Sequence, residues 1–503
     1  MATLITSLCG WGRYPVQSCE LERPERYANL RPATDNVIAR GQGRSYGDAA
    51  LNEGGRVLLT ERVNRLLEFD VGQGVLRAEA GATLAEILEV IVPKGWFLPV
   101  TPGTKFVSLG GCVAADVHGK NHHHDGSFGD HVLAIELFLA DGSRVNCSAT
   151  EKPELYWATV GGMGLTGIIG EVTLKLIPIQ TPHMMVRHHQ AGNLEQLFTL
   201  LQNPISDDRY SVAWIDSMAG GKQLGRGIAM CGHHALAEEL PPGYRNPAQS
   251  PLFISLPRIP SPQSSPASGR GSERERLSSI PTGERDKVSL RERHVKRNRA
   301  IPFDLPSLAL NPLSIAAFNA LYYRREGAKR QPFISSHDAF FYPLDAIGDW
   351  NRMYGKRGFV QYQCVIPQPT AFDGIASLLQ ELSGSGRPSF LAVLKRLGAQ
   401  NKGLLSFPMA GYTLALDLPI RSEKLLAGHP DEGLFALLDK LDRIVLQHGG
   451  RVYLAKDARL AAESFRAMYP RYEEWLKIKR ALDPQNMFGS SLSRRLKIGA
   501  EQA

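Results

Sequence analysis

The chain has 503 residues, of which 43% are hydrophobic and 21% are charged, and it carries a formal net charge of +8. This length and composition are typical of a soluble globular protein with two or more domains. They exclude a core built on disulfides or structural zinc, because the six cysteines are scattered and none belongs to a CxxC pair.

The cysteines and the apolar runs also indicate in which cellular compartment the protein is found. Scattered cysteines suit a reducing environment. No apolar run approaches the roughly 20 residues that a membrane span needs, and the N-terminus, MATLITSLCGWGRYP, lacks the basic and apolar regions of a signal peptide. We therefore expect a cytoplasmic protein, with peripheral contact at the inner face of the membrane as the alternative.

Much of the positive charge lies in one segment. Residues Ser261–Ala300 contain ten Arg or Lys and five Asp or Glu, so they supply +5 of the net +8. The stretch 255–300 is rich in Pro, Ser, Gly and Arg and has almost no apolar periodicity, which predicts a disordered surface insertion. Since the rest of the chain is near neutral, we expect no nucleic-acid partner.

The first feature that suggests a ligand is a short strand followed by a glycine-rich loop. A buried strand is predicted at Asn36–Ala39, and the loop Ala39–Asp48 (ARGQGRSYGD) follows it directly. Alternating glycines leave backbone N–H groups uncovered, and such a loop suits a pyrophosphate. A helix is then predicted over Thr83–Val92, with Glu86 in its first turns.

A second stretch of small residues runs from Val100 to Gly142. It contains Pro102-Gly103, Gly110-Gly111 and the segment Asp116–Lys120. Runs of Gly, Ala and Ser let the main chain approach a ligand closely. This stretch therefore predicts contact with a large flat cofactor that carries phosphates.

A third glycine motif imitates a dinucleotide fingerprint. Gly162, Gly164 and Gly167 have the spacing G-x-G-x-x-G. The fingerprint has to follow a strand and begin a helix, with an acidic residue about 20 positions later. Here a helix is predicted before it, at Leu155–Val160, and a strand after it, at Ile168–Ile179. We therefore reject Rossmann-type binding at this motif.

From Thr181 onward the pattern changes to that of a second, α+β domain. Its predicted strands are Met184–His188, Tyr210–Ile215, Phe359–Ile366, Phe390–Arg396 and Tyr412–Leu418. Its predicted helices are Leu194–Leu201, Ala371–Ser383 and Leu434–His448. The tail continues with the charged segment Arg451–Arg459, a helix over Phe465–Leu482 and a turn at Asp483–Phe488.

The ordered set of motifs resembles the FAD-linked oxidases of the vanillyl-alcohol-oxidase type. The resembling pieces are GWGR at Gly10, ARGQGRSYGD at Ala39, PGT at Pro102, GGCVAADVHGKNHHHDGSFGDHV at Gly110, GGMGLTG at Gly161, LNPLSIAAFNALYY at Leu310, QYQ at Gln361, LAVLK at Leu391, SFP at Ser406, and YLAKDAR and KIKRALDPQNMF in the tail. They cover nearly the whole chain apart from the insertion.

This resemblance implies an α+β fold with two domains. A PCMH-type FAD-binding domain would comprise residues 1–182, and a substrate (cap) domain would comprise 183–449, including the insertion at 255–300. The segment 450–503 would return to the FAD domain. No metal is expected, because adjacent residues such as His122, His123 and His124 rarely converge on one ion; we expect these three to be solvated on a turn.

The resemblance also implies which residues contact FAD. The expected cofactor-binding residues are Ala39, Arg40, Gly41, Gln42, Gly43, Arg44, Ser45, Tyr46, Gly47, Asp48, Gly103, Ser108, Leu109, Gly110, Gly111, Ala115, Asp116, Val117, His118, Ile169 and Tyr453. Several relatives attach the flavin covalently to a histidine in the first glycine loop. This chain has Arg44 there, so we expect non-covalent FAD.

The expected chemistry is the oxidation of an alcohol, which needs hydride loss from carbon and proton loss from the hydroxyl. Lys456 is the candidate base, because a lysine near a buried flavin has a lowered pKa; the alternative is a surface lysine beside Asp457. Tyr46 and His118 are further catalytic candidates, although both could be structural. The expected substrate-binding residues are Lys395, Gln363, Gln361 and Lys120.

The function that the resemblance implies is oxidation of the C2′ hydroxyl of a polyprenyl-phospho-ribose-like sugar. A short-chain NAD-dependent reductase would act on the keto product, completing an epimerisation that supplies arabinose-type precursors for the cell wall. The alternative keeps FAD but takes a soluble alditol or aldonolactone. A flavin-free binding protein that works through its basic loop is the competing class.

Overall fold

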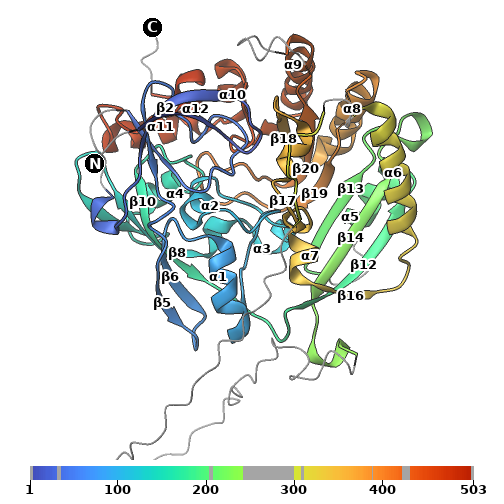
Figure 1. Ribbon diagram of the computed structural model, residues 1–503, viewed down its shortest axis with the longest axis horizontal. Helices are drawn as coiled ribbons and strands as arrows, with labels where there is room; N and C mark the ends of the chain where they lie inside the picture. The colour runs from blue at the N-terminus through green and yellow to red at the C-terminus, as the bar shows by residue number, and fades with distance from the viewer. Residues whose placement is uncertain are drawn as a thin grey trace, which may run out of the picture.

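The computed structural model describes residues 4–30, 36–202, 208–241, 299–306, 311–387, 389–421 and 431–499. Figure 1 shows two lobes, one with the N-terminal strands and one with a large sheet from the middle of the chain. The C-terminal helices, in red, lie back against the N-terminal lobe. Mixed helix and sheet in two lobes confirms the predicted α+β class.

The N-terminal lobe contains two sheets and a short strand pair. The first sheet has the order β1-β2-β4-β3 and is built from β1 (Leu4–Cys9), β2 (Val16–Glu22), β3 (Val37–Arg40) and β4 (Arg56–Leu59). The second has the order β5-β6-β10-β8-β9 and is built from β5 (Leu66–Asp70), β6 (Val75–Glu79), β8 (Val132–Phe138), β9 (Arg144–Cys147) and β10 (Ile168–Lys175). The pair consists of β7 (Trp96–Phe97) and β11 (Ile177–Pro178).

Four helices accompany these sheets: α1 (Leu84–Ile91), α2 (Leu109–Ala114), α3 (His122–Asp125) and α4 (Pro153–Thr159). Helix α1 shows how the sequence specifies them. Thr83 and Glu86 form a capping box, in which each side chain accepts a hydrogen bond from the other's backbone N–H. Its buried residues, Leu84, Ile87, Leu88 and Ile91, follow the spacing of one helix face. The helix predicted over Thr83–Val92 is confirmed.

The middle lobe is organised on an eight-stranded sheet with the order β16-β12-β14-β13-β19-β20-β18-β21. Its strands are β12 (His183–Ala191), β13 (Tyr210–Ile215), β14 (Gly227–His234), β16 (Phe333–Ser336), β18 (Phe359–Pro367), β19 (Ala392–Leu397), β20 (Gly411–Pro419) and β21 (Arg451–Val452). Helices α5 (Leu194–Gln202), α8 (Ala371–Gly384) and α9 (Glu432–Gln447) pack on it. The strands and helices predicted here are confirmed.

Two further helices and a strand pair complete this lobe: α6 (Pro312–Gly327), α7 (His337–Phe341), β15 (Arg299–Ala300) and β17 (Ile347–Gly348). The predicted insertion at 255–300 lies outside the described residues, apart from Arg299–Ala300, which pair in parallel with β17.

Strand alternation decides which side chains of this sheet face the N-terminal lobe. Tyr362, Cys364, Leu394, Leu414 and Leu416 belong to the hydrophobic core beneath α5, α8 and α9. The residues between them therefore point the other way. Those residues include Gln361 and Gln363 on β18, Val393 and Lys395 on β19, and Ala415 and Asp417 on β20.

The tail crosses from one lobe to the other. It begins as β21 at the edge of the large sheet and continues into α10 (Ala462–Met468), α11 (Tyr472–Leu482) and α12 (Ser491–Arg495). The indole N–H of Trp475 donates to the carbonyl of Ala158 over 2.8 Å, which fixes α11 on α4. The single helix predicted over Phe465–Leu482 is wrong, because Pro470 falls inside it and proline interrupts helical hydrogen bonding.

Among the described residues, no helix is both long and apolar enough to cross a membrane.

Candidate active site

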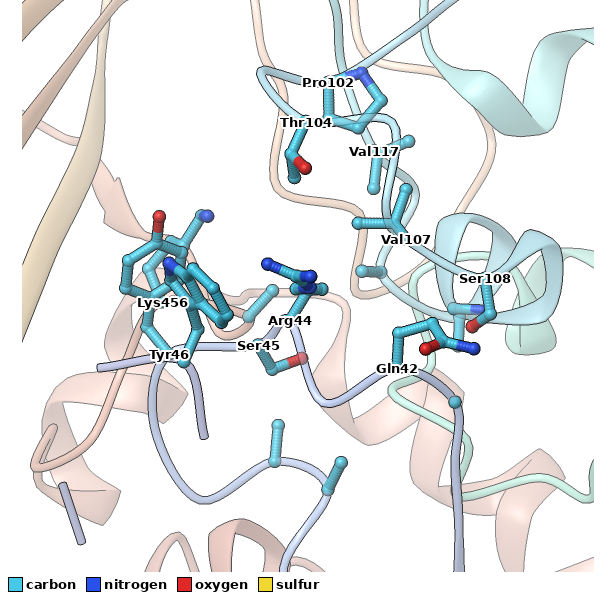
Figure 2. Close-up of a pocket in the computed structure, with 18 of the residues that line it drawn as sticks. Gln42, Arg44, Ser45, Tyr46, Pro102, Thr104, Val107, Ser108, Val117 and Lys456 are labelled. Atoms are coloured by element: carbon cyan, nitrogen blue, oxygen red, sulfur yellow. The ribbon is translucent and has the colours of Figure 1, made fainter. Parts of the chain in front are cut away.

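A cavity lies where the two lobes meet, and its wall is built from several separate parts of the chain. The first and second glycine-rich stretches supply one side, and β18, β19 and β20 supply the other. The tail closes it with Tyr453, Ala455 and Lys456. Figure 2 shows Lys456 and Tyr46 together on one side, Arg44 beside them, and Gln42 and Ser108 farther along the wall.

The first glycine-rich loop leaves β3 and folds against its neighbours at close range. A Cβ on Gly41 would lie 2.0 Å from Ser108 Oγ, so this position brings the two loops into contact. Gly43 has a φ of +63°, a left-handed conformation that glycine adopts without strain. The Arg44 guanidinium lies 3.9 Å from the centre of the Trp11 ring. The Trp11 N–H in turn donates to the carbonyl of Ser45.

The second stretch places α2 and the segment after it along the cavity. The Ser108 side chain caps α2 by accepting a hydrogen bond from the Gly111 N–H. The N–H groups of Leu109 and Gly110 donate to the carbonyls of Ala82 and Ala80, which ties the start of the helix to the second sheet. Gly103 borders open space, since a Cβ there would meet no atom within 4 Å. The motif at Gly161–Gly167 contributes Met163, Gly164 and Gly167 to the same wall.

Two lysines of the cavity wall, Lys456 from the tail and Lys395 from β19, have no hydrogen-bond or ion-pair partner among the described residues. Lys456 lies 3.9 Å from the centre of the Tyr46 ring, and neither it nor Lys395 makes a hydrogen bond or ion pair through its ammonium group with any described residue. Burial lowers the pKa of Lys395 to about 8. Burial also lowers the pKa of Lys456 to about 7; the Asp417 carboxylate opposes this change and the charge of Lys395 adds to it.

The polar groups beside these lysines are neutral. The Gln363 amide nitrogen lies 3.0 Å from His118 Nε2 and donates to Thr413 Oγ1 over 3.1 Å. His118 is 5% exposed, and its Nδ1 has no hydrogen-bond partner among the described residues. Burial, together with the charges of Lys395, His122 and Lys456, holds the pKa of His118 well below its usual range. A neutral imidazole at this wall can still form a hydrogen bond with a ligand.

Most of the sequence-predicted site residues line this cavity. They are Ala39, Gly41, Gln42, Gly43, Arg44, Ser45, Tyr46, Gly103, Ser108, Gly110, Gly111, Ala115, Val117, His118, Ile169, Gln361, Gln363, Lys395, Tyr453 and Lys456. Their individual roles remain predictions.

Six predicted residues are absent from the wall because each is held elsewhere. The Arg40 guanidinium donates to the carbonyls of Cys9 and Ala50. Asp48 forms an ion pair with Arg495, 2.8 Å apart. A Cβ on Gly47 would meet the carbonyl of Asp457 at 1.8 Å.

The other three lie in the second stretch. Leu109 is fully buried in the core of the N-terminal lobe. Asp116 accepts hydrogen bonds from the Gly129 N–H, the Asn401 amide and the Ser406 hydroxyl. Lys120 donates to the carbonyl of Phe340 and lies against that ring. The predicted roles of these six residues in binding cofactor or substrate stay predictions.

The prediction that all three adjacent histidines are solvated is wrong for His122. Its side chain is 1% exposed, and Nδ1 accepts a 3.0 Å hydrogen bond from the Gly398 N–H. Nε2 therefore carries the proton and donates to Ser127 Oγ over 3.0 Å. His124 is exposed, as predicted. The sequence around His122 could not show that the segment at Gly398, distant in the chain, packs over its side chain.

Sequence reasoning also missed several residues of the site. Trp11, Leu344, Trp350 and Leu391 line the cavity, and Asp417 lies behind it. The signal for Asp417 was available, because it follows Ala415 by two positions on an alternating strand. No comparable signal existed for Leu344 or Trp350, which lie in short 3-10 helices between the main elements.

The composition of the wall fits a phosphate-bearing flavin cofactor. No Asp or Glu lines the cavity in the described part of the chain, whereas Arg44, Lys395 and Lys456 do. Bare backbone at Gly103, Gly110 and Gly111 permits close approach of a flat ring and its phosphates. This fold and cavity suit a flavin-binding oxidoreductase.

Comparisons with known proteins identify the family. An FAD-binding domain model matches residues 23–148, and a D-arabinono-1,4-lactone oxidase model matches residues 432–496. Decaprenylphosphoryl-β-D-ribose oxidase of Mycolicibacterium smegmatis is 34% identical over 99% of this chain and 98% of the relative. The chain therefore belongs to the FAD-dependent oxidase family that includes that protein.

Two more distant matches agree with this placement. A putative D-arabinono-1,4-lactone oxidase of Neurospora crassa is 29% identical over 33% of this chain and 29% of its own length. The solved structure of a variant of the Physcomitrella patens BBE-like 1 protein has a TM-score of 0.61 and 12% identity, and the match covers 93% of this chain and 90% of that one. The structural likeness supports the fold. The chain is an FAD-dependent oxidoreductase.

Proposed function

We propose that this chain oxidises the C2′ hydroxyl of a pentose carried on a polyprenyl phosphate to the ketone. The observation that carries the proposal is the pair of unpartnered lysines, Lys395 and Lys456, on one cavity wall whose described residues include no carboxylate. The match to decaprenylphosphoryl-β-D-ribose oxidase along almost the whole chain supports the substrate class.

The residues divide into a group that holds the cofactor and a group that faces the substrate. The first glycine-rich loop, Gly103, Ser108 and the start of α2 would hold FAD, and Tyr453 would close over it. We infer that FAD is held without a covalent bond, because Arg44 stands where relatives carry a histidine. FAD, when bound, supplies the acceptor for the hydride that leaves the substrate carbon.

Lys456 would act as the base. With a pKa of about 7, a large fraction of its side chains is neutral at physiological pH and can take the hydroxyl proton. Lys395, with a pKa of about 8, remains mostly protonated at pH 7 and can bind the substrate phosphate. Gln361, Gln363, His118 and Tyr46 would hydrogen-bond the sugar hydroxyls. The same wall excludes bulk water from the reacting carbon.

The test is anaerobic turnover of the purified FAD-loaded protein. A short-chain polyprenyl-phosphoryl-β-D-ribose should bleach the visible absorbance of the flavin and give a product two hydrogens lighter than the substrate. Free ribose and ribitol should bleach it far more slowly. Failure of every phosphorylated pentose to bleach a fully loaded protein would contradict the proposal.

The second candidate is oxidation of a soluble alditol or aldonolactone. It is favoured by the lactone oxidase match over residues 432–496, a span that includes Lys456. Lys395 separates the two candidates, because only a phosphorylated substrate needs that charge. If Lys395→Met reduces turnover of neutral and phosphorylated substrates equally, the soluble substrate is the better assignment.

Two partners follow from the proposed chemistry. A ketone on a lipid-linked pentose calls for a short-chain NAD-dependent reductase, which would return it to an alcohol of the opposite configuration. A polyprenyl chain is insoluble in water, so the protein would meet its substrate at the inner face of the membrane. Sedimentation with lipid vesicles that contain the substrate, against vesicles without it, tests the second inference.

A further inference from the structure

Asp417 is a buried carboxylate beside the cavity with no role so far. It lies on β20 and is 0% exposed. Its Oδ1 accepts a 2.5 Å hydrogen bond from the Gln361 amide, and its Oδ2 accepts one of 3.4 Å from the Tyr354 hydroxyl. No described cation forms an ion pair with it. A buried carboxylate that only neutral donors hold destabilises the folded chain. We therefore expect Asp417 to have a function that offsets this loss of stability.

The carboxylate of Asp417 attracts the ammonium group of Lys456. Burial raises the pKa of Asp417 to about 6, while Gln361, Lys456 and Tyr354 act in the other direction. The two side chains attract each other without touching. The adjacent carboxylate in sequence, Asp457, is unavailable to Lys456 because Arg495 pairs with it at 2.8 Å.

The other groups that face Lys456 do not provide this compensation. Tyr46, from the first loop, presents its ring, and burial raises its hydroxyl pKa well above the usual value. Lys395, from β19, repels a second positive charge. His118 is neutral. Asp417 is therefore the carboxylate that favours an ammonium ion at Lys456.

We propose that Asp417 is a positioning residue for the proton-accepting Lys456: it fixes the Gln361 amide at the cavity wall and supplies the negative charge against which the ammonium ion forms. The inference rests on the proposed role of Lys456. As the substrate O–H bond breaks, the proton moves to Lys456 Nζ, and the hydrogen on carbon leaves with its electron pair as the hydride that FAD accepts. The new positive charge then lies near Lys395, and Asp417 offsets that repulsion.

The test measures the proton affinity of Lys456 directly, without substrate. Pulse acylation of the FAD-loaded protein across a pH series, read by mass spectrometry at Lys456, gives the midpoint at which the amine becomes reactive. We expect a midpoint near pH 7 in the native chain. Asp417→Asn, which keeps the shape and removes the charge, should lower it by about one pH unit. The acidic limb of the kcat profile should move the same way.

The matched control is Asp442→Asn. Asp442 is also buried in this lobe, with a pKa raised to about 6 by burial, and it accepts a 3.0 Å hydrogen bond from Tyr362. Unlike Asp417, it also pairs with an arginine, Arg459. Tyr362 alternates with Gln361, so Asp442 lies on the opposite face of the sheet. Its substitution should leave the Lys456 midpoint unchanged.

Flavin content and the unfolding temperature establish that each variant is folded. If Asp417→Asn does not fold, Asp417→Ser makes the same test, because it also removes the charge and leaves space for water. A folded, uncharged variant that keeps the native midpoint overturns the inference, and so does an equal displacement in Asp442→Asn. Acylation needs no substrate. The assay therefore tests the effect of Asp417 on Lys456 even if the proposed substrate is wrong.

Discussion

Replacing Lys395 by methionine should make the protein more stable while impairing its proposed function. The ordinary lysine pKa of 10.5 falls to about 8 in the folded chain because of burial. A difference of about 2.5 pH units corresponds to about 3 kcal/mol by which folding disfavours the charged form. Part of the side chain borders the cavity, where water screens the charge, so about 2 kcal/mol is a fairer figure.

The sign follows from linkage. Below pH 8 the side chain is protonated in both the folded and the unfolded chain, and the whole penalty is present. Between pH 8 and 10.5 the folded chain releases its proton first, so the penalty shrinks and then disappears. Lys395→Met should therefore raise the unfolding temperature at pH 7 by about 2 °C for a chain of this length. The gain should disappear near pH 10.5.

Thermal unfolding of the FAD-loaded protein at several pH values measures this gain. Lys479→Met is the contrasting control. Lys479 is buried, and its ammonium pairs with Asp483 and donates to the carbonyl of Phe488. Its removal leaves a buried carboxylate unpaired and should cost about 3–5 kcal/mol. The reasoning is refuted if Lys395→Met is no more stable than the native chain at pH 7.

The same variant reports on substrate binding. Loss of one charge-assisted contact to a phosphate costs about 1.5–3 kcal/mol, so KM for a phosphorylated pentose should rise by about tenfold to a hundredfold. The kcat at saturation should change less than KM, because the lysine binds the phosphate and takes no direct part in the transfer of the proton or the hydride. KM for a neutral polyol should stay near its native value.

Three further predictions concern the base and the cofactor. Lys456→Met should lower kcat by about 10²–10⁴-fold while the flavin content is retained, because a positioned base accelerates a reaction by about this factor. Turnover at the native rate in stopped-flow measurements would exclude Lys456 as the base. Gly41→Ala should lower FAD content at least about tenfold, because its Cβ would meet Ser108 Oγ at 2.0 Å. Gly220→Ala is the control and should bind FAD normally, because the space around its Cβ is open. The ratio of flavin absorbance to protein absorbance in the purified variants measures the FAD content. Acid precipitation should release all FAD to the supernatant; yellow colour retained in the pellet would demonstrate a covalent bond.

Sequence reasoning succeeded where the signal was local. The capping box at Thr83 and the alternation in β18 and β20 depend on residues a few positions apart, and those elements formed as expected. The two glycine-rich stretches also reached the cavity, because bare backbone is rare elsewhere in a compact chain. The family resemblance added Lys456, which its own neighbourhood could not distinguish from a surface lysine.

It was incomplete where the outcome depended on distant contacts. His122 was expected to be solvated, but the Gly398 segment covers it. The sequence placed Asp48 in a phosphate-binding loop and Asp116 beside the cofactor, and those roles stay predictions; what it could not show is that Asp48 pairs with Arg495, 447 residues away, and that Asp116 accepts a hydrogen bond from Ser406. In each case the deciding partner comes from a part of the chain that no local pattern could connect to it.

The path of the tail has a consequence for biosynthesis. Lys456 and Tyr453 follow the whole large sheet in the chain. Arg495, still later, pairs with both Asp48, at the end of the first glycine-rich loop, and Asp457, next to Lys456. A ribosome-bound chain that has already emerged through β20 thus holds the glycine-rich loops and all strands of the sheet except β21, but it lacks the groups that close the cavity. Capture of the cofactor should therefore be a late, post-translational event, and nascent or prematurely terminated chains should stay colourless and inert.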